Sequence, residues 1–220
     1  MHVFFLKLNR KKGVEIVNKF DIASKTWDQS ERRNKMNEFI VRYLKEKVNL
    51  ENKIILDYGC GTGNLGINLI EKSDKVIFVD KSQGMLDVLN EKLVNTDKNR
   101  YEIIKINEIS EFESIENFDI LVSSLVFHHI KNINLAVENI YKRLNNNGKI
   151  IIIDLITEDG TFHKENFDGH KGFSKDYMKN ILVKFGFINV KVDDIYIMEK
   201  SIGNLIKKFP IFIAIGEKYE

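Results

Sequence analysis

Apolar and polar positions change their spacing near Asn52, and the change separates two kinds of predicted structure. From Ser30 to Val48 apolar residues recur every three or four positions, which predicts one amphipathic helix. A shorter helix is predicted around Val14 to Phe20. After Asn52 short apolar runs alternate with segments of helical period, which is typical of domains in which strands and helices alternate.

The apolar runs contain Ile, Val and Leu with few interruptions, as in strands buried on both faces of a parallel sheet. In chain order they read KIILDY, KVIFVD, YEIIKI, FDILVSSL, GKIIIIDL, INVKVDDIYIMEK and FPIFIAIGEK. The helices predicted between them are Asn64–Glu71, Met85–Leu93, Asn134–Leu144 and Lys175–Phe185. The predicted fold class is α/β, with a doubly wound, mostly parallel seven-stranded sheet and helices on both faces.

The last two predicted strands are separated only by Ser201–Lys208. This segment is too short for a crossover helix, so the last strand is predicted to run antiparallel to its neighbour. We divide the chain into an N-terminal extension and helical cap, residues 1–51, and a cofactor-binding domain, residues 52–220, which form one compact unit. The cap and the loop Thr157–Ser174 are expected above the carboxyl ends of the strands.

Composition and charge narrow the class of protein. The chain has 220 residues, 43% of them hydrophobic, and its 34 basic and 32 acidic residues leave a net charge of +2. Such a charge gives no overall field that would recruit nucleic acid or an anionic membrane. Cys60 is the only cysteine, which excludes an internal disulfide, and no apolar run approaches the roughly 20 residues that span a bilayer. We therefore expect a cytoplasmic monomer or homodimer that binds neither nucleic acid nor membrane.

The stretch ILDYGCGTGNLG joins the first predicted strand to a helix, where doubly wound sheets bind ligands. Gly59, Gly61 and Gly63 permit positive φ or a close approach of the ligand to the backbone. Gly61, Gly63 and Gly66 also satisfy the dinucleotide pattern G-x-G-x-x-G, so glycine spacing alone does not identify the ligand.

Two carboxylates make this ligand site more specific. Asp57 lies two residues before the first glycine and places negative charge where a pyrophosphate would approach, which favours a cationic or zwitterionic ligand over NAD. Asp80 ends the next strand, where a carboxylate accepts hydrogen bonds from ribose hydroxyls. The two carboxylates and the glycine loop predict a nucleoside site.

Five segments in order, ILDYGCGTGNLG, VIFVDKSQGML, IKINEIS, FDILVSSLVFHHI and RLNNNGKIIIIDL, resemble the successive motifs of the class I S-adenosylmethionine-dependent methyltransferases, of the small-molecule type. The resemblance runs from about Asn52 to the C-terminus and implies S-adenosylmethionine as cofactor and S-adenosylhomocysteine as product. It implies that Asp80 holds both ribose hydroxyls and that Asn107 meets the adenine amino group. The full set of implied cofactor-binding residues is Asp57, Gly59, Cys60, Gly61, Thr62, Gly63, Asp80, Lys81, Met85, Asn107, Glu108 and Ser124.

Residues for catalysis and for the methyl acceptor are expected beyond the fourth strand and in the cap. His128 and His129 are candidate general bases, because an imidazole titrates near neutrality. In the resemblance a pair of histidines here also frames the methionine end of the cofactor, and both readings stay open. Candidate residues of the acceptor pocket are Trp27, Arg32, Asp154, His163, His170 and Phe173.

A metal site is considered in the loop after the fifth strand and is not predicted. Histidines and carboxylates gather there, but their spacing matches no ligand motif known to us. The acceptor is expected to be a small organic molecule. Methylation of RNA or protein, a non-catalytic cofactor-binding protein and, least favoured, an NAD-dependent oxidoreductase are the alternatives. The N/D-P-P-Y/F/W motif of amino-directed enzymes is replaced here by Ser123, Ser124, Leu125 and Val126.

Overall fold

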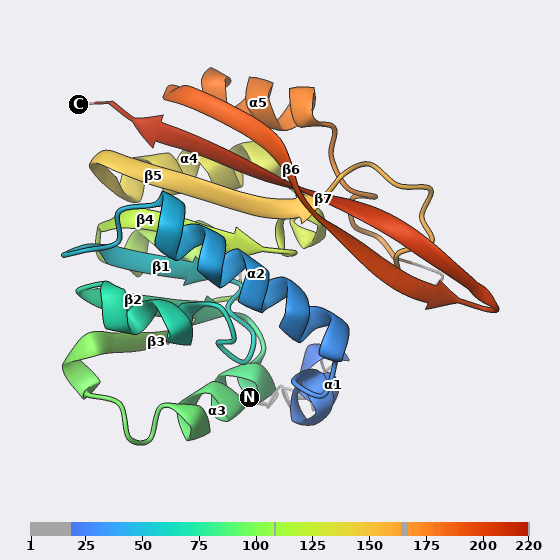
Figure 1. The fold of residues 1–220 in the computed structure, drawn as a ribbon. Coiled ribbons are helices and arrows are strands. Elements are labelled where there is room, and N and C mark those ends of the chain that lie inside the picture. The colour runs from blue at the N-terminus through green and yellow to red at the C-terminus, as the bar shows by residue number, and fades with distance from the viewer. Residues whose placement is uncertain (1–18, 108, 164–166, 220) are drawn as a thin grey trace, which may run out of the picture.

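A computed structural model describes residues 19–107, 109–163 and 167–219 of the chain. Its centre is a seven-stranded sheet in the order β3-β2-β1-β4-β5-β7-β6 (Figure 1). The strands are β1 Ile54–Tyr58, β2 Lys75–Asp80, β3 Tyr101–Lys105, β4 Phe118–Ser124, β5 Leu144–Leu155, β6 Phe187–Ile202 and β7 Leu205–Lys218. Strands β1 to β5 are parallel, and β7 pairs antiparallel with both β5 and β6. The predicted fold class and the antiparallel last strand are therefore confirmed.

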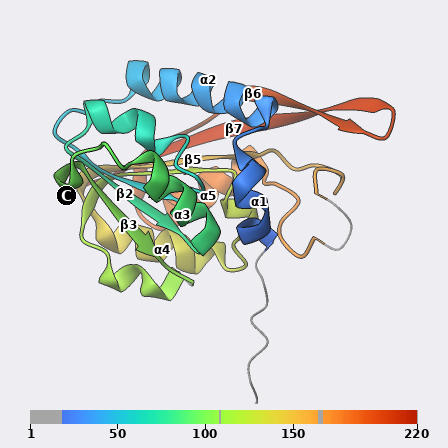
Figure 2. The same ribbon diagram turned by 90° about the horizontal axis from the view of Figure 1, so that it is seen from below.

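Helices cover both faces of the sheet (Figure 2). The α-helices are α1 Lys19–Trp27, α2 Glu31–Lys47, α3 Gln83–Lys92, α4 Ile133–Arg143 and α5 Lys175–Lys184. The 3₁₀ segments are η1 Gly66–Lys72, η2 Lys98–Arg100, η3 Ile109–Ser114 and η4 Phe127–His129. Buried side chains of α2, η1 and α3 form one core with the sheet, and those of α4 and α5 form the core on the opposite face.

The long helix α2 was predicted correctly because the sequence shows both a capping residue at its start and a stripe of apolar residues along one face. Ser30 caps α2, since its hydroxyl accepts a hydrogen bond from the Arg33 amide. Met36, Ile40 and Leu44 lie one turn apart and are buried against the sheet. α2 therefore shares the core of residues 52–220, and the domain boundary at residue 51 stays a prediction. None of the helices in the described residues is long and apolar enough to cross a bilayer.

Several predicted boundaries differ from the structure. The helix expected at Asn64–Glu71 is the 3₁₀ segment η1, which begins at Gly66, the last glycine of the stretch. The helix expected around Val14 to Phe20 lies almost wholly outside the described residues, and α1 begins at Lys19. The connector expected at Ser201–Lys208 is wrong, because Leu205 to Lys208 belong to β7 and pair with β6.

The segment predicted as a connector is instead part of an arm formed by β6 and β7. Beyond the sheet β6 and β7 continue as a two-stranded ribbon, drawn in red, that reaches past the other strands (Figure 1). The ribbon carries the exposed side chains Leu205 and Ile206 among charged residues, so its sequence has no continuous apolar run. Met198, at its base, is buried and contributes to the core.

Candidate active site

A cavity of about 810 Å³ opens at the carboxyl ends of the parallel strands, beneath the N-terminal helices. It is lined by the glycine loop, by the ends of β2 and β4, by the segment before η4 and by α1 and α2. Predicted site residues that line it are Trp27, Arg32, Asp57, Gly59, Cys60, Gly61, Thr62, Asp80, Lys81, Met85, Asn107, Ser124, His128, His129 and His163. The structure thus brings most of the predicted cofactor and acceptor residues into one space.

The glycine loop has a backbone conformation that favours glycine, and backbone hydrogen bonds hold it against β2. Gly59, Gly61 and Gly63 all have positive φ, at 71°, 54° and 80°. The amides of Gly59 and Cys60 both donate to the Val79 carbonyl, at 2.7 and 3.0 Å. Burial raises the pKa of the Cys60 thiol well above its ordinary value, so this side chain is a small neutral residue of the loop.

Asp80 joins the loop to the next strand. One carboxylate oxygen accepts the Gly61 amide at 2.8 Å and the other accepts the Ser82 amide at 2.8 Å. Burial raises the pKa of Asp80, while these amides act in the opposite direction. A carboxylate oxygen has more than one lone pair, so both oxygens can still accept a hydrogen bond from a ligand. The predicted contact with ribose stays a prediction.

Asp57 is buried, and it accepts the Gly66 amide at 3.0 Å. Burial raises its pKa to about 7. At neutral pH the side chain is then only partly ionised, and a neighbouring anion would protonate it further. The charge argument against a pyrophosphate ligand is therefore weaker than the sequence suggested.

We expect the free energy of unfolding of the cofactor-free protein to depend on pH because the pKa of Asp57 is raised. Between about pH 4 and about pH 7 folded Asp57 keeps a proton that the unfolded chain has lost, so wild type loses stability as pH rises through this window. Asp57→Asn does not titrate and still offers an oxygen to the Gly66 amide. Urea unfolding at several pH values should show the difference shifting in favour of the variant as pH rises. A difference independent of pH would place the folded pKa at its ordinary value.

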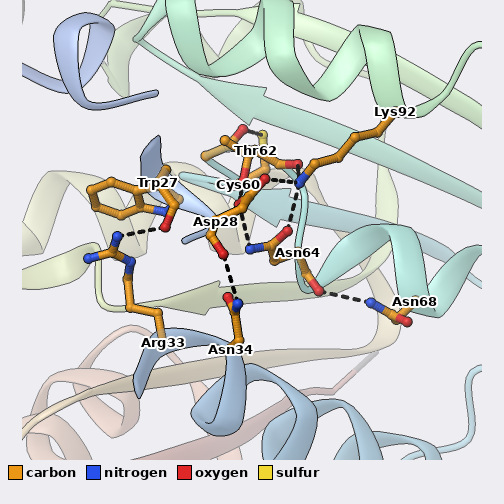
Figure 3. Close-up of polar contacts among 10 residues, drawn as sticks. Trp27, Asp28, Arg33, Asn34, Cys60, Thr62, Asn64, Asn68 and Lys92 are labelled. Atoms are coloured by element: carbon orange, nitrogen blue, oxygen red, sulfur yellow. Dashed lines mark hydrogen bonds and ion pairs between the residues drawn. The ribbon is translucent and has the colours of Figure 1, made fainter. Parts of the chain in front are cut away.

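The cap is fastened to the glycine loop by a residue that sequence reasoning missed. One Asp28 oxygen accepts the Thr62 hydroxyl at 2.6 Å and the Asn64 amide group at 2.8 Å, and the other pairs with Lys92 at 2.6 Å (Figure 3). A lone aspartate after Trp27 gives no sequence signal for this role. Asp21 acts similarly, because its carboxylate accepts from Ser82 and from the Gly84 amide.

Trp27 and two arginines form the side of the cavity beneath the cap. The Arg33 guanidinium donates to the Trp27 carbonyl at 2.6 Å and lies 4.0 Å from the centre of its ring (Figure 3). The Trp27 ring nitrogen lies beside Gly61, 3.8 Å from where a β-carbon would be. In the described structure the Nε atoms of Arg32 and Arg33 are buried without a hydrogen-bond partner. The two arginines place positive charge on the cavity wall.

Three histidines meet at the other side of the cavity. Ring centres of His128 and His129 are 4.2 Å apart, and His163 lies 4.9 Å from the first and 5.2 Å from the second. His128 is almost completely buried, and its Nδ1 lies 2.6 Å from the Asp154 carboxylate. The sequence separates His163 from the other two by more than 30 positions, and only the fold brings them together.

Burial and positive neighbours keep two of these imidazoles neutral. Burial, with His128 and His163 nearby, lowers the pKa of His129 far below its usual range. Burial and His128 lower the pKa of His163 to about 4. A general base works best when its pKa lies near the operating pH, so in the cofactor-free protein these two rings are hydrogen-bond acceptors rather than strong bases.

Four predicted site residues do not line the cavity as the structure describes it. Asp154 is fully buried behind His128, and Phe173 packs in the core below α4 and α5. His170 places its Nε2 3.0 Å from the Ile130 carbonyl, and Gly63 is packed against Leu89. Glu108 lies outside the described residues. Lining residues that the sequence did not indicate are Phe20, Met198 and Lys200, which come from the distant α1 and β6.

The sheet order with its antiparallel last strands, and a cavity at the first glycine loop, define a Rossmann-like fold of the methyltransferase type. The methyltransferase domain family matches residues 56–150. An uncharacterized methyltransferase of Schizosaccharomyces pombe is 31% identical over 155 residues, which cover 63% of this chain and 54% of that protein. One from Bacillus thuringiensis is 28% identical over 166 residues, covering 72% of this chain and 76% of that protein. These likenesses support a class I S-adenosylmethionine-dependent methyltransferase, and the matched family domain covers less than half of the chain.

Solved structures share the fold at low identity. Phosphoethanolamine N-methyltransferase 2 of Haemonchus contortus, in complex with phosphomonomethylethanolamine and S-adenosylhomocysteine, superimposes with a TM-score of 0.68 at 17% identity, over 93% of this chain and 61% of that one. A chain from the Haloferax volcanii complex of a methyltransferase with its Trm112 activator also gives 0.68, at 14% identity over 92% and 99%. The present chain spans about half the length of the first curated relatives it matches, at 54%, 42% and 51%.

Proposed function

We propose that the protein transfers a methyl group from S-adenosylmethionine to a small organic acceptor. The observation that carries the proposal is one cavity in which the glycine loop and Asp80 lie at one side and three histidines at another. Its volume of about 810 Å³ falls in the range of about 300–1,000 Å³ typical of small-molecule sites. The structural relative with bound phosphomonomethylethanolamine and S-adenosylhomocysteine supports a cofactor and a small molecule together in this fold.

The residues present fit S-adenosylmethionine. The Ser124 hydroxyl and the Nε atoms of Arg32 and Arg33 are buried at the cavity without hydrogen-bond partners in the described residues, so they can serve the polar ends of a ligand. The open side of Gly61 is bordered by Trp27 and Met85, which leaves room for a ligand against the backbone. In this arrangement Asp80 would hold the ribose, and Lys81, Met85 and Asn107 would border the adenine.

The chemistry needs positioning more than a covalent protein nucleophile. S-adenosylmethionine, when bound, would supply a methyl group activated by its positively charged sulfur, and S-adenosylhomocysteine would be left when the acceptor's lone pair takes that methyl. His128 and His129 would contact the acceptor, and the neutral His129 ring would accept a hydrogen bond from it and orient its lone pair. The acceptor's proton leaves to solvent or to a histidine whose basicity changes when ligands fill the cavity. O- and N-acceptors satisfy this scheme, whereas a carbon acceptor would attack with a pair of π electrons.

Labelling tests the acceptor class directly. Purified protein with methyl-labelled S-adenosylmethionine and a metabolite extract should place label in small molecules, whereas Asp80→Ala should not. Label found only in RNA or protein would refute the small acceptor. Binding of S-adenosylhomocysteine without labelling in any fraction would support a non-catalytic binding protein, and stabilisation by NAD alone would refute the cofactor.

Asp80→Ala should weaken S-adenosylhomocysteine binding by about 1.5–3 kcal/mol, as is typical of hydrogen bonds to a charged group. Because Asp80 also holds the Gly61 amide, part of the loss could come through the loop. Calorimetry with 5′-methylthioadenosine and its 2′,3′-dideoxy analogue separates the two effects. Wild type should lose affinity for the deoxy analogue and Asp80→Ala should not distinguish the two ligands. Equal discrimination by both proteins would exclude the ribose contact.

A further inference from the structure

The three histidines at the acceptor side have the geometry of ligands around a common point. Each of His128, His129 and His163 offers one ring nitrogen, and these nitrogens all lie within 4.8 Å of one another. The first two come from η4, which follows β4, and the third comes from the loop after β5. That loop is held beside the β6–β7 arm by Lys200, which donates to the Phe162 carbonyl, and by Lys207, which pairs with Asp159 (Figure 1). Both contacts come from the arm, which therefore holds the segment that carries the third histidine.

Asp154 gives His128 the arrangement seen in metal-ligating histidines. Its carboxylate bonds His128 Nδ1 at 2.6 Å and the backbone amide of the same residue at 3.1 Å. The carboxylate therefore fixes the ring orientation and makes Nε2 the remaining ring nitrogen with a free lone pair. A carboxylate behind the imidazole in this way orients a ligating histidine and makes it a better donor. Asp154 is itself fully buried and lies outside the cavity lining, so it serves the histidine rather than a ligand.

The packing of the His163 ring does not account for its buried nitrogen Nε2. Its ring stacks on Phe167, with centres 3.8 Å apart and planes 19° apart. Stacking accounts for the ring orientation, but Nε2 is buried without a hydrogen-bond partner among the described residues. A buried polar atom without a partner is uncommon and calls for a ligand or a solvent molecule.

We propose that His128, His129 and His163 bind a divalent transition-metal ion of the zinc type, with a fourth position open to the cavity. Three imidazoles suit zinc, and three protein ligands with one open position are the pattern of catalytic rather than structural zinc sites. Small ring rotations bring three nitrogens from within 4.8 Å of one another to a common ion. The proposed set differs from the loop residues considered at the sequence level, because only His163 belongs to both.

The charged side chains around the three histidines determine which kind of fourth ligand the metal ion would take. Basic side chains outnumber acidic ones in the lining of the same cavity, which includes Lys19, Lys81, Lys200, Arg32 and Arg33 together with Asp57 and Asp80. Asp154 is the carboxylate in contact with His128. A divalent ion in positive surroundings favours an anion in its open position. An acceptor that presents a thiol or hydroxyl would supply one, releasing its proton to solvent on binding and keeping a lone pair for the methyl carbon. This last step rests on the proposed function, whereas the metal site does not.

Metal binding by the full chain tests the site without any turnover. Protein stripped with a chelator is titrated with Zn²⁺ against a chromophoric competitor, and Co²⁺ is added separately to record the visible bands of a four-coordinate ion. Wild type should bind one equivalent, and His163→Gln should lose more affinity than the about 10–100-fold typical for removing an outer partner of a ligand. His170→Gln is the matched control, because His170 lies in the same loop and bonds the Ile130 carbonyl instead. Its affinity for Zn²⁺ should equal that of wild type.

Equal Zn²⁺ affinity of wild type and His163→Gln would overturn the proposal, as would a Co²⁺ spectrum that the substitution leaves unchanged. Thermal unfolding of each stripped variant establishes that it is folded before titration. If His163→Gln does not fold, His129→Gln takes its place with the same expected loss. Tight Zn²⁺ binding without methyl transfer would leave the metal site standing and reject the proposed function, while methyl transfer by stripped protein without Zn²⁺ binding would do the reverse.

Discussion

Replacing Asp154 with alanine is expected to lower the free energy of unfolding by at least about 3 kcal/mol, since it leaves three buried donors without a partner and each costs about 1–3 kcal/mol. The Asp154 carboxylate accepts three hydrogen bonds, from His128 Nδ1 at 2.6 Å and from the amides of His128 and Leu155 at 3.1 and 2.7 Å. All three donors lie in residues that are almost completely buried. Urea unfolding of the metal-stripped protein measures the loss.

An exposed carboxylate in the loop that follows β5 shows whether burial is the cause. Asp159 is exposed and pairs with Lys207, so Asp159→Ala should destabilise the protein much less than Asp154→Ala does. Asp154→Asn keeps one acceptor oxygen and should fall between the two substitutions. A loss at Asp154 no larger than at Asp159 would mean that the buried pair is not what holds η4 in place, and the orientation of His128 would need another explanation.

The fold was predictable because parallel strands that are buried on both faces have almost continuously apolar sequences. Runs such as Ile150 to Ile153 are buried on both faces, so their sequence is apolar at every position. The 3₁₀ segment after the glycine loop and the β6–β7 arm were not predictable in the same way. A 3₁₀ turn and a helix share the same short apolar spacing, and a solvated two-stranded ribbon such as Glu199 with Lys208 buries too little to leave a pattern.

One part of the candidate site could be predicted from the sequence, and the other part could not. The cofactor side is contiguous in sequence, because a strand, its glycine loop and the next strand end supply Asp57, Gly61 and Asp80. The acceptor side is assembled from α1, η4, the loop after β5 and β6, which lie far apart in the chain. No spacing rule links His163 to His128, and a residue such as Asp28 shows its role only through the partners that the fold gives it.

Gly59→Ala should destabilise the protein by about 2–5 kcal/mol, through left-handed strain of about 1–2 kcal/mol and overpacking of about 1–3 kcal/mol. Gly59 has φ of 71°, and an added β-carbon would lie 2.3 Å from one methyl of Val126 and 2.6 Å from the other. Valine is stiff about its first side-chain torsion, so it cannot turn both methyls away. Because Val126 leads into η4, this contact also sets how closely the cofactor loop approaches the histidines.

A double-mutant cycle separates the two costs. Val126→Ala removes both methyls, so Gly59→Ala in that background should keep the strain and lose most of the clash, leaving about 1–2 kcal/mol. The same variants should lose affinity for S-adenosylhomocysteine in proportion to the clash, because a displaced loop no longer presents the Gly61 amide to Asp80 at 2.8 Å. Additive effects of the two substitutions on unfolding would show that the loop and the segment before η4 are not in contact. The glycine loop and the histidines would then be positioned independently of each other.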